Sequence, residues 1–288
     1  MPVRIIFLVV VALFSVSTSS LVVRHLADVP AVVIAFWRMA IASGLLWIYS
    51  FSHKKALSSL NRKRVFYSGV FLGFHFALFF GAVKLTSIAN ATVLGTLAPV
   101  FTLFVEKLIY RRPFNGVLVL GLLISLLGAL VINGNQFSFN NEPFIGNLMA
   151  ILCSLCIALS WMVAEKVRES SGAITYSRSV FFVAAFVLFL ISIFRGESIF
   201  FVSLGHMGWF VFLGVVPTIF GHVVLSFILK FVSPTMVASI PLGEPIVASG
   251  LALILFNESL SSVTLVGGAL TLIGLYFIIR EQVNHISS

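Results

Sequence analysis

The chain has 288 residues, of which 60% are hydrophobic and 9% are charged, and its formal net charge is +9. A soluble domain carries roughly 25% charged residues, so this chain holds too few charges to build a water-facing surface. The composition excludes collagen-like, disordered, disulfide-stapled and nucleic-acid-binding proteins, and it indicates an integral membrane protein.

Long apolar stretches separate the charged residues. They are about 17 to 23 residues long, the length that crosses a hydrocarbon core roughly 30 Å thick. They lack the alternation of apolar and polar residues that is typical of barrel strands. Because a helix satisfies its own backbone polar groups in lipid, each stretch predicts a helix. Taken in chain order, the predicted transmembrane helices cover residues 5–23, 31–50, 65–83, 89–109, 116–133, 145–164, 176–194, 206–228, 234–256 and 262–279. The sequence thus predicts an all-α membrane protein with ten transmembrane helices.

The basic residues fall mainly on one set of loops. With ten crossings, thirteen of the 18 Lys and Arg residues lie on the side of the amino terminus, among them the cluster within residues 54–64. Because cytoplasmic loops retain positive charge, both termini are predicted to lie in the cytoplasm. The protein itself is predicted to lie in the inner (plasma) membrane of the cell. A cleavable signal peptide over the first twenty residues is the alternative, which would leave nine spans.

The chain also contains an internal repeat. A shift of 146 positions aligns, without a gap, Lys84 with Lys230, Ser87 with Ser233, Pro99 with Pro245, Gly121 with Gly267 and Gly128 with Gly274. Each repeated unit has five predicted helices, an odd number, so the second unit enters the membrane upside down relative to the first. The predicted units are residues 1–135 and 144–282, arranged as an inverted repeat around a central cavity.

Short motifs accompany the aligned prolines. The first half contains Ala98-Pro99-Val100-Phe101 followed by Gly121 and Gly128. The second half contains Glu244-Pro245, then Asn257-Glu258-Ser259-Leu260, and then Gly267-Gly268 and Gly274. These motifs resemble the EamA family of the drug/metabolite transporter superfamily. The resemblance implies a ten-helix carrier, and many members export amino acids and related metabolites. The acidic residue usual after helix 4 of the family is Arg112 here, so no role is carried over to that position.

Glu244 is the most informative ionisable residue. Such groups inside a bilayer cost about 2.5 to 3.5 kcal/mol each on insertion scales, so those at depth are functional candidates. Glu244 lies ten residues into the predicted helix 234–256, between Pro241 and Pro245. A proline removes an amide donor and kinks its helix, so Pro99, Pro241 and Pro245 are expected to distort the helices that shape the cavity. Glu244 is predicted to bind a proton or a cationic substrate group, and the alternative is a structural glutamate satisfied by a neighbouring helix.

Two arginines lie inside predicted helices. Arg38 is eight residues into the helix 31–50, where it is a candidate partner for a substrate carboxylate or for Glu244. Arg178 is three residues into the helix 176–194, so its side chain can also reach the lipid headgroups. For both residues a purely structural role stays open.

Four uncharged polar or aromatic residues complete the predicted site. His75 and His222 lie in the middle of their helices and are candidates for a hydrogen bond to substrate or for a proton relay. Asn90 offers an amide at a helix start, and Trp161 offers a ring face to a cation. A satisfied core histidine and a packing or interface tryptophan are the structural alternatives.

The remaining motifs do not indicate an enzyme. Cys153 and Cys156 form a C-x-x-C pair without a second pair or a nearby histidine, and no Gly-Lys dipeptide occurs for a nucleotide-binding loop. We therefore expect no metal, no cofactor and no nucleic-acid partner. The prediction is a secondary transporter, as a monomer or weak dimer, that exports a small polar metabolite such as an amino acid or derivative by alternating access. The alternatives are uptake or exchange of a nucleotide-derived metabolite, an integral-membrane enzyme, and a non-transporting receptor or assembly protein.

Overall fold

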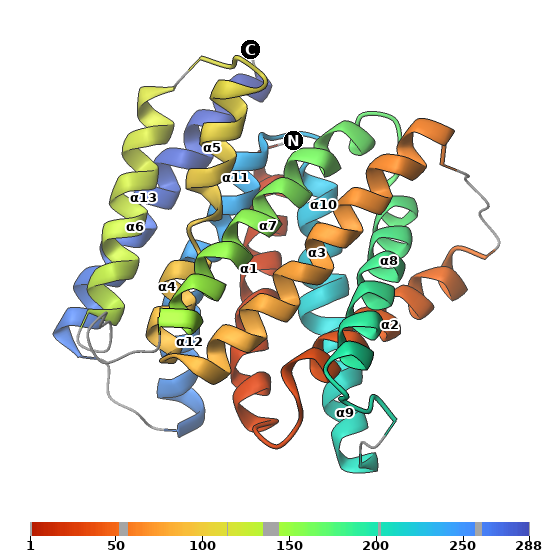
Figure 1. Ribbon diagram of the computed structural model, residues 1–288. Helices are drawn as coiled ribbons and strands as arrows, with labels where there is room; N and C mark the ends of the chain where they lie inside the picture. Colours follow the sequence, from red (N-terminus) through yellow and green to blue (C-terminus); the bar gives the residue numbers. More distant parts are fainter. Residues whose placement is uncertain are drawn as a thin grey trace.

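The computed structural model describes residues 2–51, 57–113, 115–134, 144–200, 203–256 and 261–287. All the secondary structure in these residues is helical, and the helices pack into one bundle with both chain termini at the same end (Figure 1). The all-α fold predicted from composition is confirmed. The motif at residues 257–260 lies outside the described residues.

The helices follow the predicted order. The first half contributes α1 (Pro2–His25), α2 (Ala31–Tyr49), α3 (Ser59–Leu85), α4 (Ile88–Gly95), α5 (Ala98–Leu108) and α6 (Gly116–Asn133). The second half contributes α7 (Phe144–Arg168), α8 (Ala173–Phe194), α9 (Leu204–Leu213), the π-helix η1 (Gly214–Val223), α10 (Val224–Ile228), α11 (Pro234–Ser239), the 3₁₀-helix η2 (Ile240–Gly243), α12 (Glu244–Phe256) and α13 (Ser262–Ser287).

Each predicted span falls on one of these helices or on a run of consecutive ones. Within the described residues, seven helical segments are long and apolar enough to cross a membrane, and Val3–Ser19 and Gly116–Ile132 are shorter apolar segments. The membrane-helical class is therefore confirmed, whereas ten crossings remain a prediction.

Two spans predicted as continuous helices are broken at matching points of the repeat. The span 89–109 divides into α4 and α5, and Pro99 is in the first turn of α5. The span 234–256 divides into α11, η2 and α12, where Pro241 is in the first turn of η2 and Pro245 is the second residue of α12. A proline fits a helix start because its missing amide hydrogen has no partner to lose there. The chain thus restarts a helix at each proline.

A third span has an unexpected segment. The span 206–228 was predicted as one α-helix, but its centre is the π-helix η1, which contains Pro217. In an α-helix the amide of residue 217 would bond to the carbonyl of Leu213, and proline has no amide hydrogen to give. The hydroxyl of Thr218 donates to that carbonyl instead, at 2.7 Å. The side-chain hydroxyl therefore satisfies the Leu213 carbonyl inside the bundle.

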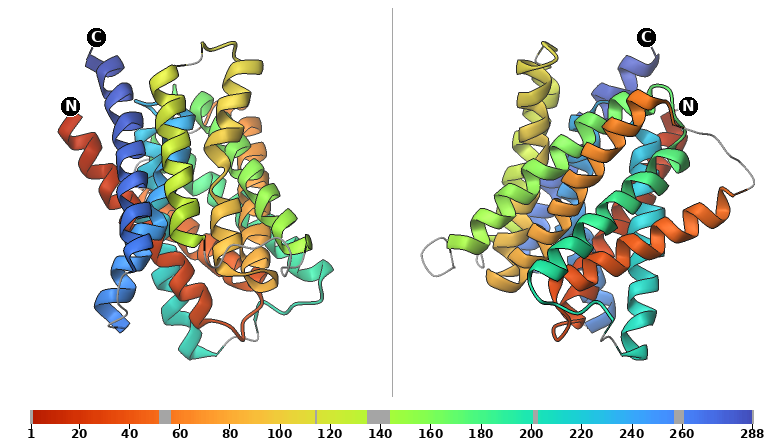
Figure 2. Two further views of the ribbon diagram at one scale, coloured as in Figure 1. Left: turned by 90° about the vertical axis from the view of Figure 1, so that its left-hand side faces the viewer. Right: turned by 45° about the vertical axis from the view of Figure 1, so that its right-hand side comes forward.

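The last helices of the two halves, α6 and α13, run antiparallel and pack against each other (Figures 1 and 2). Their glycines meet crosswise, because a Cβ at Gly121 would lie 2.7 Å from the carbonyl of Gly274, and one at Gly128 would lie 2.6 Å from that of Gly267. The contact of Gly121 with Gly274 is thus repeated, with the two halves interchanged, by the contact of Gly128 with Gly267. A two-fold axis between the halves produces this pattern. We call this contact the glycine seam. An antiparallel pair of equivalent helices is what oppositely oriented repeats produce.

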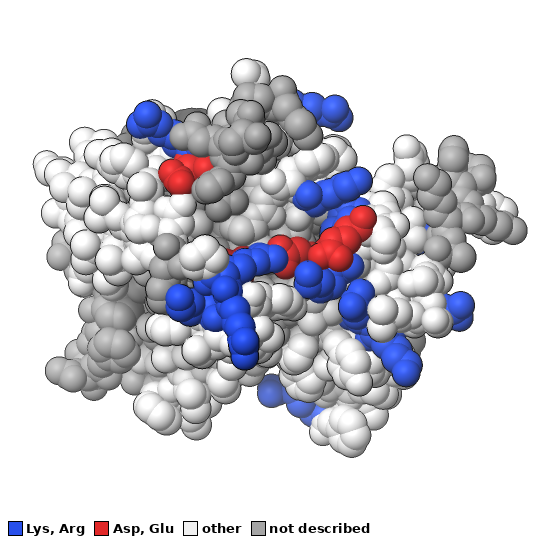
Figure 3. Space-filling view, turned by 90° about the horizontal axis from the view of Figure 1, so that it is seen from above, with Lys and Arg blue, Asp and Glu red and all other residues white. Residues whose placement is uncertain are grey.

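Basic side chains gather on the face of the bundle that carries the two termini (Figure 3). Among them is Arg112, in the turn between α5 and α6, which bonds to acidic residues of two helices. Lys84 and Arg195 lie instead at the carboxyl-terminal ends of α3 and α8.

Candidate substrate-binding cavity

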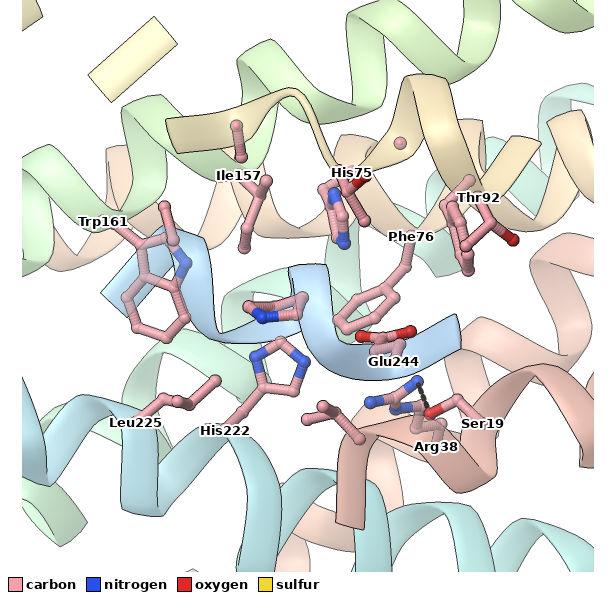
Figure 4. Close-up of a pocket in the computed structure, with 17 residues that line it drawn as sticks. Ser19, Arg38, His75, Phe76, Thr92, Ile157, Trp161, His222, Leu225 and Glu244 are labelled. Carbon is pink, nitrogen blue, oxygen red and sulfur yellow. Dashed lines mark hydrogen bonds between the residues drawn. The ribbon is translucent and has the colours of Figure 1, made fainter. Parts of the chain in front are cut away.

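A central cavity of about 80 Å³ lies where the two halves meet (Figure 4). About 10–15 Å³ of such space holds one water molecule, so there is room for several waters or a small polar group. The polar and charged part of its lining consists of Ser19, Arg38, His75, Thr92, Thr96, Trp161, His222 and Glu244. The break between α4 and α5 and the break at η2 both border this cavity, through Ala98 and Pro241 respectively.

Arg38 enters the cavity from α2, and neutral residues hold it in place. Its Nε donates to the Thr218 hydroxyl at 2.8 Å, and its Nη1 donates to the Ser19 hydroxyl at 3.1 Å. Its guanidinium carbon lies 4.4 Å from the centre of the Phe76 ring, a cation–π contact. These bonds engage two of the five N–H groups of a guanidinium. None of these partners carries a negative charge, so they orient the cation without neutralising it.

Glu244 faces Arg38 across the cavity (Figure 4). It is the first residue of α12, immediately after the short helix η2. The charges of Glu244 and Arg38 act on each other through space, and the two side chains form no direct ion pair in the described structure. Ala98, at the repeat-equivalent position, also lines the cavity. The acidic group is therefore supplied by the second half at this pair of positions.

The two histidines present different nitrogens for bonding. His75 Nδ1 lies 2.9 Å from the carbonyl oxygen of Cys153. A carbonyl only accepts, so Nδ1 carries the hydrogen and a neutral His75 keeps Nε2 as an acceptor. His222 lies on η1 and stacks on the ring of Trp161, with centroids 6.0 Å apart. Its Nδ1 is buried and has no hydrogen-bond partner among the described residues. Such an atom costs about 1–3 kcal/mol unless the cavity contents satisfy it.

The cavity thus brings together Arg38, His75, Trp161, His222 and Glu244, which the sequence had separated by up to 206 positions. The predicted residues Asn90 and Arg178 lie elsewhere. Asn90 is buried and its amide donates to the side-chain oxygen of Asn147 at 3.0 Å. Arg178 lies near the start of α8 and donates to the Ser50 hydroxyl at 2.6 Å. Their predicted part in substrate binding remains a hypothesis, and neither borders the cavity.

Sequence reasoning missed the residues that hold Arg38. Thr218 and Phe76 are neutral and common in membrane helices, so no pattern distinguishes them. Ser19 belongs to a hydroxyl-rich stretch of α1 that predicts close helix packing first. The one available signal for Thr218 is Pro217 beside it, since a proline inside an apolar span frees a carbonyl that a hydroxyl can bond.

A second polar cluster joins the halves at the end that carries the termini. Arg112 donates to Glu106 of α5 and to Glu165 of α7, both at 2.9 Å, and Thr235 of α11 donates to Glu106 at 2.7 Å. We call these four residues the polar latch. Burial lowers the pKa of Arg112, but the hydrogen bonds and charges of Glu165 and Glu106 outweigh it and raise that pKa overall. Arg112 therefore stays positively charged at any ordinary pH.

Among the described residues, no three His, Cys, Asp or Glu side chains gather as a metal site requires. Cys153 is buried, and both it and Cys156 are free thiols.

Comparisons with known proteins agree with this architecture. A sequence model described as the EamA-like transporter family matches residues 3–134 and, a second time, residues 144–280. An uncharacterized transporter of Archaeoglobus fulgidus is 26% identical over 257 residues, which cover 87% of this chain and 89% of the relative. The pseudopaline exporter CntI of Pseudomonas aeruginosa is 24% identical over 279 residues and 96% of each chain. One crystal structure matches the fold with a TM-score of 0.81 and 17% identity over 98% of each chain.

Proposed function

This chain belongs to the EamA-like transporter family, and from that premise we propose that it exports a small zwitterionic metabolite, such as an amino acid or derivative, by alternating access. The observation that carries the proposal is the opposed pair of Arg38 and Glu244 in the central cavity.

The opposed charges fit a substrate that carries both signs. A carboxylate accepts two parallel hydrogen bonds from a guanidinium, and Arg38 has N–H groups beyond those engaged by Thr218 and Ser19. An ammonium group on the same substrate would lie against the Glu244 carboxylate. Nδ1 of His222 and Nε2 of His75 supply further polar contacts at the other side of the cavity. A ligand with one charge alone would leave the opposite residue without a charged partner on the ligand, and an unpaired charge inside the bundle is costly.

The export direction and the membrane topology are the finer parts of the proposal. The relative named as a pseudopaline exporter supports export. The charge of the loops supports cytoplasmic termini in a plasma membrane. In the alternating-access cycle the two halves rock about the cavity, which the helix breaks at α5 and η2 border through Ala98 and Pro241. Glu244 would then bind either a proton or the substrate ammonium, so that one carboxylate couples proton binding to substrate binding.

The test is transport by the purified protein in proteoliposomes. Labelled amino acids and nucleotide metabolites are followed in uptake and counterflow, with and without a pH gradient, for wild type and for Glu244→Gln. Glu169→Gln is the matched control, because Glu169 is an exposed acid whose ion pair with Lys166 lies far from the cavity lining. We expect the flux of zwitterions to fall about tenfold or more in Glu244→Gln, since a bond to a charged group contributes about 1.5–3 kcal/mol.

Three outcomes would contradict the proposal. Transport of nucleotide metabolites in place of zwitterions would assign the cavity to another substrate class. Full transport and unchanged pH dependence in Glu244→Gln would remove the acid from the mechanism. Absence of flux across the whole panel, with folded protein, would favour a receptor or assembly role.

A further inference from the structure

A groove on the outer surface of the bundle runs between α2, α3 and α8. Its wider part has a volume of about 650 Å³ and contains two cations, Arg62 and Arg178, beside apolar side chains of Phe66, Phe182 and Val183. No acidic residue lines this part in the described structure. Figure 2 shows why the space exists, since the carboxyl-terminal end of α2 leans away from the rest of the bundle.

The groove continues along α2 as a second, apolar recess. That recess has a volume of about 560 Å³, is lined by aromatic residues such as Phe186 and Phe189, and shares Trp47 and Phe182 with the first part. From Ser50 to Trp37, α2 rises about 20 Å at 1.5 Å per residue. One leaflet of a bilayer has a hydrocarbon depth of roughly 15 Å, half of the whole core. The groove is therefore long enough for an acyl chain of a single leaflet.

The cations lie at the level of a lipid headgroup. Arg62 is the fourth residue of α3, Arg178 is the sixth residue of α8, and Ser50 directly follows α2. All three are therefore near helix ends, where a membrane helix leaves the hydrocarbon. Trp47, which is 45% exposed, lies with its ring against the Arg178 guanidinium at 4.2 Å. Tryptophan at this depth is typical of a membrane interface.

We propose that this groove binds one anionic phospholipid, with the headgroup phosphate between Arg62 and Arg178 and an acyl chain along Trp47 and Phe182. An apolar surface facing a bilayer is covered by lipid in any case. The described lining holds two guanidinium groups and no Asp or Glu, so it selects the charge of the headgroup. Guanidinium pairs well with phosphate because its planar fork matches two phosphate oxygens. The site is separate from the central cavity, with which it shares no lining residue.

Quenching of Trp47 fluorescence by brominated lipids tests the proposal. The full-length protein in detergent is titrated with brominated phosphatidylglycerol or brominated phosphatidylcholine, and the Trp47→Phe variant supplies the signal of the other tryptophans. We expect phosphatidylglycerol to quench Trp47 at a concentration about fivefold lower than phosphatidylcholine does. One cation beside an anionic headgroup increases the affinity for the lipid by about this factor.

Charge variants separate a built site from a general basic surface. Arg62→Gln is expected to remove most of the preference, and Arg62 is exposed, so this variant keeps the fold. Lys63→Gln is the matched control, since Lys63 is the adjacent exposed cation on α3 and does not line the groove. Equal quenching by the two lipids would overturn the proposal. So would a loss of preference in Lys63→Gln equal to that in Arg62→Gln, or quenching that persists unchanged in Trp47→Phe.

Discussion

Thr218 fixes the position of Arg38 through a sequence of local causes. Pro217 has no amide hydrogen, so the carbonyl of Leu213 needs another donor, and the Thr218 hydroxyl supplies it. With its hydrogen directed to that carbonyl, the hydroxyl oxygen presents its lone pairs to Nε of Arg38. One proline in an apolar helix thus determines where a cation lies on a helix 180 positions earlier in the chain. Thr218 is therefore a positioning residue for the proposed carboxylate site.

We expect Thr218→Val to raise the KM of zwitterion transport about tenfold and to change the maximal rate much less. The valine has a similar shape but cannot bond to Arg38, and a hydrogen bond to a charged group contributes about 1.5–3 kcal/mol. The concentration dependence of proteoliposome flux measures this effect. Thr218→Ser keeps the hydroxyl and should restore the wild-type KM. If Thr218→Ser is as impaired as Thr218→Val, packing rather than the hydrogen bond is responsible.

The sequence identified the charged residues of the site but not their surroundings. Arg38 and Glu244 stand out because an ionisable group inside a bilayer is costly and needs a reason. Arg178 satisfied the same criterion, yet it lies in the outer groove. Depth along a helix follows from counting residues, whereas the direction in which a side chain points depends on how the helices pack. That information enters only with the fold.

At the scale of helices, the glycine seam joins the two halves. The repeat alignment predicted that Gly121 matches Gly267 and that Gly128 matches Gly274. It did not predict that Gly121 would face Gly274 and that Gly128 would face Gly267. The antiparallel contact leaves space for hydrogen atoms only, and such close approach is how small residues stabilise helix pairs in membranes. Likewise, the sequence predicted distorted helices at the prolines but not the π-helix η1, which depends on the neighbouring helices.

Gly128→Ala is expected to destabilise the protein by about 1–3 kcal/mol, the usual cost of overpacking. The new Cβ would lie 2.5 Å from the backbone nitrogen of Thr271 and 2.6 Å from the carbonyl oxygen of Gly267, so the backbones must separate. Thermal unfolding in detergent measures the change. Gly208→Ala on α9 is the control, because a Cβ there meets no atom within 4 Å. Equal midpoints for Gly128→Ala and wild type would show that the seam is not tightly packed.

At the scale of the whole molecule, the polar latch closes one end of the bundle. Glu106 and Arg112 belong to the first half, and Glu165 and Thr235 belong to the second, so every opening of the halves at this end must break these bonds. The latch therefore favours the conformation in which the end that carries the termini is closed. Because Arg112 stays charged, pH does not release the latch through this residue.

Arg112→Gln is expected to increase access to the cavity from the end that carries the termini. A cysteine at Ala238, which lines the cavity, is labelled with a membrane-impermeant thiol reagent in a chain whose two native cysteines are replaced by serine. Loss of a partly exposed ion pair of about 1 kcal/mol would raise the labelling rate about fivefold. Lys166→Gln is the control, since its ion pair with Glu169 stays within one half. Equal labelling rates in both variants would show that the latch does not hold the halves closed.

The two broken helices also constrain how the chain is assembled during synthesis. At 1.5 Å per residue, α4 with its 8 residues and α11 with its 6 residues each extend only about 12 Å or less, too short to enter a bilayer alone. The break between α4 and α5 is covered by α7 and α11, which leave the ribosome later, whereas η2 and α12 pack on α1, which is already in place. A chain that stops after residue 134 would leave the first break uncovered against lipid. The first half therefore completes its structure only when the second arrives, and the insertion machinery must shelter it until then.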